Sequence, residues 1–178
     1  MEHKFGTVAL MGPPNAGKST LMNTILGEKL AIVTPKPQTT RNRISGIWTT
    51  DAAQVVFMDT PGVHKLRGRM NKFLLQAAWD ALAQADALVA VLDASLYAKK
   101  SGLFDKETAP LAEPLASSGR PLLVAANKID LVGDKRKLLA VLAASAEVWP
   151  GAEIFPVSAT TGDGVPALCA RILELLPE

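Results

Sequence analysis

The sequence predicts an α/β protein with one mainly parallel, doubly wound sheet that helices cover on both faces. Two observations predict this fold. Short apolar runs typical of buried strands alternate with helix-compatible stretches along the whole chain. In addition, 178 residues without an internal repeat or an inner linker suit one compact domain. We therefore expect a single domain over residues 1–178, with its ligand-binding loops at the carboxyl ends of the strands.

The first half of the chain is predicted to contain three strands, one helix and a long loop. The apolar run at residues 5–11 is typical of a buried strand, and a helix follows near residues 19–26. Residues 28–43 contain two prolines and three threonines with little periodicity, so we interpret them as a loop. Residues 44–50 and 54–59 are predicted to form a strand pair joined by a short polar turn.

The second half alternates helices and strands more regularly. After a loop at residues 60–69, apolar residues recur at i, i+3, i+4, i+7 and i+11 from Met70 to Ala81, which predicts an amphipathic helix. Pro110 and Pro114 lie inside a later helical stretch, which we therefore expect to start late or bend. The remaining predicted strands cover residues 86–93, 121–127 and 153–158, and the remaining helices cover residues 104–118, 135–148 and 165–176.

Composition excludes several classes of protein. A chain with 48% hydrophobic and 20% charged residues is globular rather than disordered. No apolar stretch approaches the length of a membrane span and no signal peptide is visible, so we expect a cytoplasmic protein. A net charge of +2 does not by itself indicate a nucleic-acid surface, and we expect no binding to DNA. The single cysteine, Cys169, lies among apolar residues and is interpreted as a core residue.

The segment GPPNAGKST, residues 12–20, matches the phosphate-loop pattern G-x-x-x-x-G-K-[ST] between a predicted strand and helix. Inward backbone N–H groups and the positive end of the helix dipole favour a polyphosphate there, although a chance turn is the alternative. Lys18 would contact the outer phosphates, and the Ser19 hydroxyl would bind Mg²⁺. The nucleotide-binding residues predicted in this loop are Pro14, Asn15, Ala16, Gly17, Lys18, Ser19 and Thr20.

The segment FMDTPG contributes a second candidate group of residues. Asp59 closes an apolar strand, so its carboxylate is expected at the carboxyl edge of the sheet, where it can hold Mg²⁺ through water. Gly62 offers an unhindered backbone N–H to a terminal phosphate. A helix cap or a turn is the alternative interpretation of an aspartate at a strand end.

The segment NKID, residues 127–130, predicts selection of guanine. The Asp130 carboxylate can accept from guanine N1–H and the 2-amino group, whereas adenine presents an acceptor at N1 and lacks that amino group. A site built on such hydrogen bonds rejects the wrong partner by roughly 10⁴. The Lys128 stem can lie over the base, and Asn127 can tie this loop to the phosphate loop. The alternative is a solvated turn.

The last motif is SAT, Ser158 to Thr160, which follows the final predicted strand. The Ala159 N–H can reach the guanine 6-oxo oxygen, and Ser158 and Thr160 complete the predicted nucleotide site. The motif has little weight alone. All four motifs, however, fall at the ends of separate strands, and in a doubly wound sheet these ends face one crevice. The order of the motifs therefore predicts a site for GTP and GDP.

This ordered set of motifs resembles the GTPase domain of the Era family, a group of translation-factor-class P-loop NTPases with a Ras-like fold. The phosphate loop GPPNAGKSTLMN is similar to that of the bacterial ribosome-assembly GTPases, and PKPQTTRNRISGIWT with DTPGVH resembles Era. The resemblance implies a three-layer α/β/α fold with a six-stranded, mostly parallel sheet and one antiparallel edge strand. It also implies a slow, Mg²⁺-dependent GTPase switch in small-subunit, 16S rRNA assembly. Another ribosome-assembly GTPase of the same class is the alternative.

The resemblance implies roles for residues that spacing leaves open. Thr40 is implied as the switch threonine, with Thr39 or a plain loop threonine as the alternatives. The catalytic set then becomes Lys18, Thr40 and Gly62, and the Mg²⁺ set becomes Ser19, Thr40 and Asp59. Asn15 is implied as a ligand of K⁺, with a purely structural asparagine as the alternative.

Val63 stands where Ras-like enzymes carry the glutamine that orients the attacking water. Backbone groups of the two loops, a partner or His64 would have to position that water. A guanine-nucleotide-sensing module with negligible hydrolysis is therefore an alternative. An ATP-using P-loop enzyme is a further alternative that rests on the phosphate loop alone.

Partners are implied by the resemblance alone. Era proteins continue into a KH module that binds 16S rRNA of the small ribosomal subunit. This sequence ends at LELLPE and contains no G-x-x-G loop of the KH type. We therefore expect RNA contact mainly outside residues 1–178, together with the peripheral association with the inner membrane that the family implies.

Overall fold

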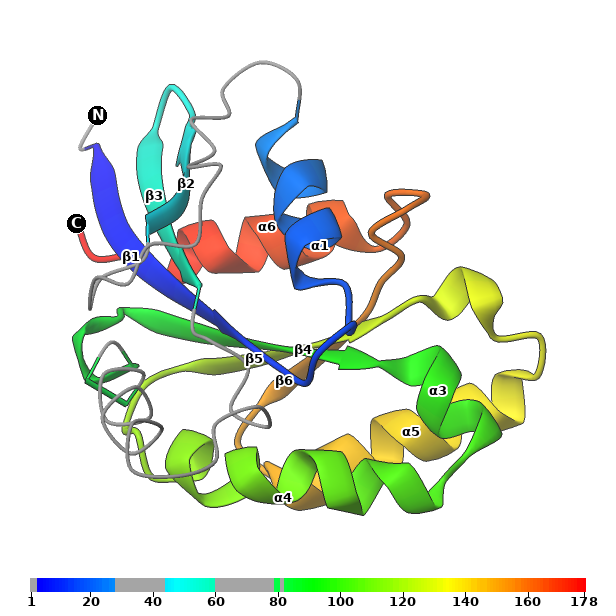
Figure 1. The fold of residues 1–178 in the computed structure, drawn as a ribbon. Helices are drawn as coiled ribbons and strands as arrows, with labels where there is room; N and C mark the ends of the chain where they lie inside the picture. The colour runs from blue at the N-terminus through cyan, green and yellow to red at the C-terminus, as the bar shows by residue number, and fades with distance from the viewer. Residues whose placement is uncertain (1–2, 28–43, 60–78, 81) are drawn as a thin grey trace.

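The computed structural model describes residues 3–27, 44–59, 79–80 and 82–178, which form a six-stranded sheet with helices on both faces (Figure 1). The strand order is β2-β3-β1-β4-β5-β6. Of the described strand pairs, β2–β3 is antiparallel and the others are parallel. The predicted sheet, including its antiparallel edge strand, is therefore confirmed. The strands are β1 (Lys4–Met11), β2 (Ile44–Thr49), β3 (Ala53–Asp59), β4 (Ala87–Asp93), β5 (Leu122–Asn127) and β6 (Glu153–Pro156).

The described helices divide between the two faces of the sheet. One face carries α1 (Lys18–Leu26) and α6 (Val165–Leu175), and the other carries α3 (Ala94–Lys99), α4 (Gly102–Ala116) and α5 (Lys135–Val148) (Figure 1). Residues 79–80 and 82–84 are helical, as expected for the end of the predicted helix at 70–81, whose other residues lie outside the described part. None of the described helices has the length and apolar character needed to cross a membrane.

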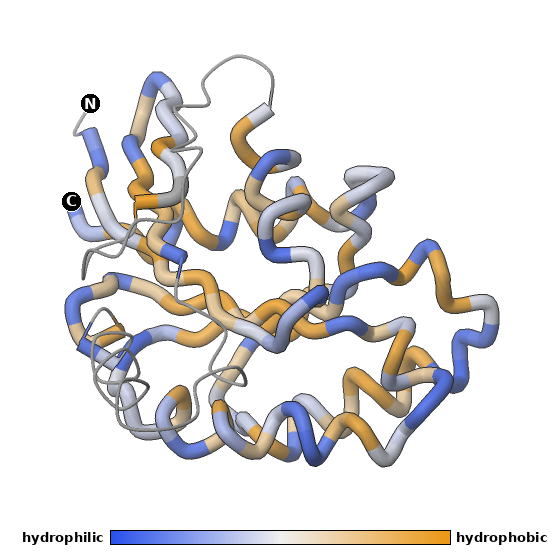
Figure 2. Tube along the Cα trace, in the orientation of Figure 1, coloured by the Kyte–Doolittle hydropathy of each residue, from blue (hydrophilic) through white to orange (hydrophobic). Residues whose placement is uncertain are grey.

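Two hydrophobic cores lie on opposite faces of the sheet. Along β1, Val8 and Leu10 pack into the core beneath α1 and α6, whereas Ala9 and Met11 pack into the core beneath α3, α4 and α5. Successive strand residues point to opposite faces, so a strand covered on both sides needs a continuous apolar run. Figure 2 shows this hydrophobic character along the central strands.

The helix α4 runs through both of its prolines. It begins at Gly102, before the predicted start, so the expected late start is wrong. Its buried residues are Phe104, Thr108, Leu111 and Leu115, and the two prolines lie outside this buried face. The hydrogen bonds that Pro110 and Pro114 cannot donate are therefore lost on the side of the helix that faces away from the sheet.

The lone cysteine belongs to the core, as its apolar neighbours predicted. Cys169 packs against the hydrophobic core beneath α1 and α6. Burial raises the pKa of its thiol to about 11, so the unreactive thiol form dominates at neutral pH.

The strand register brings the ends of four parallel strands to one edge. Leu10 of β1 pairs with Asp59 of β3, and Asp93 of β4 pairs with Asn127 of β5. Polar residues from distant parts of the sequence therefore emerge beside the loop that follows β1.

We expect Leu168→Ala to lower the free energy of unfolding by about 2–5 kcal/mol, because Leu168 is fully buried in the core beneath α6 and truncation leaves a cavity. Chemical denaturation measures this change. The same substitution at Leu139, which is 63% exposed on α5, should change stability by less than about 0.5 kcal/mol. Equal losses at the two positions would contradict the assigned packing.

Candidate functional site

The loop between β1 and α1 has two glycines with no room for a side chain. A Cβ on Gly12 would lie 2.1 Å from the Val91 carbonyl oxygen, and one on Gly17 would lie 2.3 Å from Asn127 Nδ2. Gly17 has φ +96° and Asn15 has φ +65°, so both adopt left-handed backbone. No side chain caps α1, so the N–H groups of its first turn remain available to an anion.

Asn127 connects the phosphate loop to the loop after β6. It is 1% exposed, its Nδ2 donates to the Ala16 carbonyl at 2.9 Å, and its Oδ1 accepts from the Ala159 N–H at 3.0 Å. The predicted tie between the NKID segment and the phosphate loop is therefore present. The Ala159 N–H, which was expected to face a guanine oxygen, is already engaged by Asn127. On the other side of Ala159, the Thr24 hydroxyl of α1 donates to its carbonyl at 2.6 Å.

The predicted base-selecting carboxylate is held in place by a buried serine. Ser158 is fully buried, and its hydroxyl donates to Asp130 Oδ1 at 2.8 Å. The same hydroxyl accepts from the Thr161 N–H at 3.1 Å. Among the described residues Asp130 Oδ2 has no partner, so one carboxylate oxygen orients the side chain and the other can accept from a ligand. Ser158 thus orients Asp130, a role that its motif alone did not predict.

Lys128 is held at both sides of its ammonium group. Its Nζ donates to the Asn15 carbonyl at 2.7 Å and to Asp93 Oδ2 at 3.0 Å. The Asp93 side chain is 15% exposed and the Lys128 side chain 30%. Desolvation raises the pKa of Asp93, but hydrogen bonds from Ser95, Lys128 and the Leu96 N–H outweigh it and lower the pKa below its ordinary value. Asp93 is therefore charged at neutral pH.

Lys18, Ser19 and Asp59 form the part of the site that suits Mg²⁺. Lys18 Nζ lies 3.7 Å from Asp59 Oδ1, and this buried oxygen accepts no hydrogen bond from any described residue. A buried carboxylate oxygen without a donor is unfavourable, and a hydrated cation would satisfy it. The exposed Ser19 hydroxyl at the start of α1 is a second hard oxygen ligand.

These residues fit a Mg²⁺ ion that takes some of its ligands from the protein and the others from water and substrate phosphates. Among the described residues, no group of three or more His, Cys, Asp and Glu side chains could hold a metal. Mg²⁺ keeps several waters and is usually bound through one or two protein ligands plus substrate phosphates. Asp59 and Ser19 are suited to be these protein ligands.

The remaining predicted residues divide into two groups. Pro14 and Thr160 lie on the converging loops, whereas Thr20 lies in the first turn of α1. Thr20 and Thr160 are exposed. Thr40, Gly62, Val63 and His64 lie outside the described residues, so their roles in hydrolysis stay predictions.

Two residues of the site were not predicted. Asp93 ends an apolar strand, as Asp59 does, so the signal that identified Asp59 was also present for Asp93. Thr24 gave no such signal, because a threonine within a short helix is not distinguished by periodicity. Its role depends on the contact between α1 and the loop after β6.

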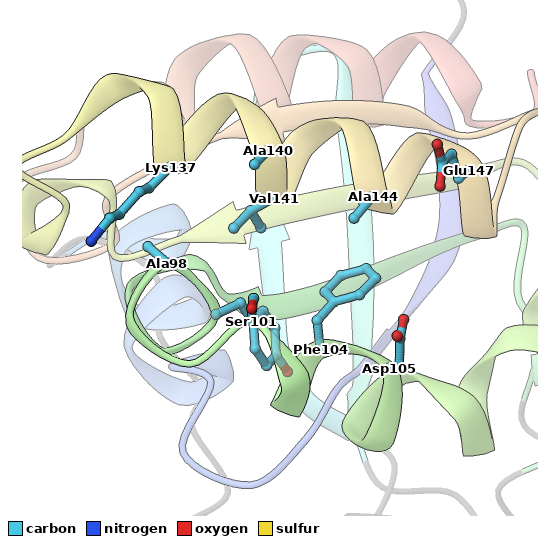
Figure 3. Close-up of a pocket in the computed structure, with 10 residues that line it drawn as sticks. Ala98, Ser101, Phe104, Asp105, Lys137, Ala140, Val141, Ala144 and Glu147 are labelled. Carbon is cyan, nitrogen blue, oxygen red and sulfur yellow. The ribbon is translucent and has the colours of Figure 1, made fainter.

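A separate cavity of about 480 Å³ lies between α5 and the α3–α4 segment (Figure 3). Phe104 and Val141 lie in its middle, Lys137 lies at one end, and Asp105 and Glu147 lie towards the other (Figure 3). None of the predicted nucleotide residues lines this cavity. The predicted nucleotide-binding residues that the structure describes lie at the sheet edge instead.

Known proteins are similar in sequence to this chain over nearly its whole length. The family described as 50S ribosome-binding GTPase matches residues 7–128. The protein named GTPase Era from Nitratidesulfovibrio vulgaris (strain DP4) is 56% identical over 176 residues, which are 99% of this chain and 57% of that protein. GTPase Era from Desulfovibrio desulfuricans is 53% identical over 100% of this chain and 58% of that protein. The chain thus spans little more than half the length of these relatives.

Solved structures agree with the sequence comparison. A crystal structure of Era in complex with MgGDPNP and nucleotides 1506–1542 of 16S ribosomal RNA has a TM-score of 0.72 and 33% identity, covering 99% of this chain and 58% of that one. A variant of Aquifex aeolicus Era bound to GDP.AlF4⁻ has a TM-score of 0.70 and 33% identity, covering 98% and 58%. The Ras-like P-loop fold and the resemblance to Era are therefore confirmed. By its loops, its sheet and its relatives, the chain belongs to the 50S ribosome-binding GTPase family.

Proposed function

We propose that residues 1–178 form the guanine-nucleotide domain of an Era-type switch that binds GTP with Mg²⁺, hydrolyses it slowly and acts in assembly of the small ribosomal subunit. The main supporting observation is the hydrogen-bonded connection of the phosphate loop, the NKID segment and the loop after β6 through Asn127. The similarity to proteins named GTPase Era supports the same assignment.

Binding would use groups that are already oriented. The uncapped first turn of α1 and the left-handed phosphate loop present N–H groups to the phosphates. Asp130, held through Oδ1 by Ser158, accepts from the two adjacent donors of guanine. Because both loops are tied to Asn127, the distance between the phosphate and base subsites is set before the nucleotide binds.

The chemistry depends on charge neutralisation at the phosphates. Mg²⁺, when bound, offsets the charge that develops on the transferring phosphoryl group. Lys18, now 3.7 Å from Asp59, would contact the outer phosphates, while Asp59 and Ser19 hold the ion and its waters. Following the sequence prediction, we assign Thr40 and Gly62 to the terminal phosphate. Without a glutamine at Val63, we expect slow unassisted turnover, on the order of 10⁻⁴ to 10⁻² per second.

The role in ribosome assembly is proposed from the relatives. The similar Era structure holds a segment of 16S ribosomal RNA, and this chain covers 58% of that protein. We propose that RNA contact is made mainly by a KH module outside these 178 residues, as the family resemblance implies. Peripheral association with the inner membrane stays a prediction.

We expect Asp130→Asn to change the base preference from guanine to xanthine. Exchanging a carboxylate oxygen for an amide donor removes charged hydrogen bonds, so GTP affinity should fall about a hundredfold while xanthosine triphosphate binds more tightly. Calorimetric titration measures both affinities. Asp51→Asn makes the same charge change at an exposed turn and should leave GTP binding unaltered. An Asp130→Asn protein that still preferred GTP would exclude this carboxylate as the selector.

We expect Asp59→Asn to weaken Mg²⁺ binding in the presence of GDP or GTP by about 10–100-fold. The amide removes the negative charge that orients the waters of the ion, and losses of this size are typical of such outer ligands. Titration of Mg²⁺ against nucleotide-loaded protein measures the effect, again with Asp51→Asn as the matched control. An unchanged Mg²⁺ affinity would contradict the assignment of Asp59.

We propose that Asn15 binds K⁺ and that this ion accelerates hydrolysis, because its exposed side chain lies on the phosphate loop. In single-turnover assays, phosphate release should be faster in K⁺ than in Na⁺, and Asn15→Gly should remove the difference. Glycine accepts the left-handed φ of +65° at this position, so the substitution deletes the ligand without straining the loop. Equal rates in both salts would refute the K⁺ site. No release above background in either salt would favour the nucleotide-sensing module over the GTPase.

A further inference from the structure

Asp93 has two carboxylate oxygens with separate partners. Oδ1 accepts from the Ser95 hydroxyl at 2.5 Å and from the Leu96 N–H at 3.0 Å, which caps the first turn of α3. Oδ2 accepts from Lys128 Nζ at 3.0 Å. The cap orients the carboxylate, and the oriented carboxylate then holds the lysine.

This pair forms because two neighbouring strands end in register. Asp93 is the last residue of β4 and lies opposite Asn127, the last residue of β5, so Lys128 is the next residue along. The backbone of Lys128 is left-handed, with φ +66°. The strand register therefore places the two residues of the pair side by side.

The second contact of Lys128 fixes the direction of its side chain. Its ammonium group lies between Asp93 Oδ2 and the Asn15 carbonyl, at 3.0 and 2.7 Å. Lys128 Cε lies 3.8 Å from the position of a Cβ on Gly17, which places the stem against the phosphate loop. Because these contacts already fix the ammonium group, less side-chain entropy of the lysine remains to be lost when a ligand binds.

Building on the proposed function, we propose that Asp93 is a positioning residue that holds the Lys128 stem where it covers the guanine base and so prolongs the lifetime of bound GDP and GTP. Asp93 does not touch the nucleotide in this assignment. Because the pair serves the base subsite and not the terminal phosphate, it should stabilise GDP and GTP equally and leave the hydrolysis step unaltered.

The test compares nucleotide binding and hydrolysis in variants of Asp93. In Asp93→Asn, an amide N–H₂ faces the ammonium group, so we expect Kd for GDP and GTP to rise equally, about five- to twentyfold, mostly through faster dissociation. The single-turnover rate at saturating GTP should stay within about twofold of the original. Asp93→Ser provides a second variant, because serine retains a capping oxygen for α3 while the carboxylate is lost, and it should show the same rise.

Two further variants separate positioning from a general structural effect. Ser95→Ala removes a bond to Oδ1 and leaves Oδ2 paired with Lys128, so Kd should change less than about twofold. In a Lys128→Met background, Asp93→Asn should raise Kd by less than about twofold, because the effect of Asp93 on binding acts through the lysine.

Three results would overturn the inference. The first is an unchanged Kd in both Asp93 variants, and the second is that Asp93→Asn raises Kd by the same factor with and without Lys128→Met. The third is a rise in Kd for GTP without a rise for GDP. If the unaltered protein binds no guanine nucleotide, the proposed function fails first and this inference fails with it. If the unaltered protein binds guanine nucleotide but the Asp93 variants show no change in Kd, this inference is rejected and the proposed function stands.

Discussion

The buried side-chain amide of Asn127 is the interaction on which the rest of the site depends. Its two polar atoms are satisfied by backbone groups of two different loops, at Ala16 and Ala159. A buried amide that lost one of these partners would leave a donor or acceptor unpaired, at a cost of about 1–3 kcal/mol. The loops are therefore held in the one arrangement that satisfies the amide. That arrangement sets the spacing between the proposed phosphate and base subsites.

Backbone conformation provides the second constraint. Gly12 and Gly17 lie where neighbouring atoms exclude a Cβ, and Asn15 and Lys128 adopt left-handed conformations that are unfavourable for most residues. Such conformations persist only when the surrounding structure enforces them. Here the two cores on either side of the sheet provide the rigid support, and the strained residues gather at the loop edge where a ligand would bind.

The candidate site contains two lysine–aspartate pairs that differ in geometry. Lys18 and Asp59 are 3.7 Å apart without a hydrogen bond at the buried Oδ1, whereas Lys128 and Asp93 form a bond of 3.0 Å. Each aspartate ends a strand and each lysine belongs to a motif loop. In the proposed function, the loose pair would turn to phosphate and Mg²⁺, and the tight pair would keep its lysine in place beside the base. The difference in distance matches the difference in proposed role.

The sequence alone determined the fold class, the six strands and the motifs at their ends, because these depend on short-range patterns: apolar runs, helical periodicity and glycine spacing. It also identified Asp59 and Asn127, which each end an apolar strand, and Asp130, which lies three residues after Asn127. It did not reveal α3, whose six residues are too few to show periodicity, and it misjudged the start of α4. Only the tertiary structure decided that Ser158 orients Asp130, that Thr24 holds Ala159 and that Asp93 holds Lys128. Each of these contacts joins residues 28 or more positions apart, and strand register and helix packing, which no local pattern encodes, bring them within hydrogen-bond distance.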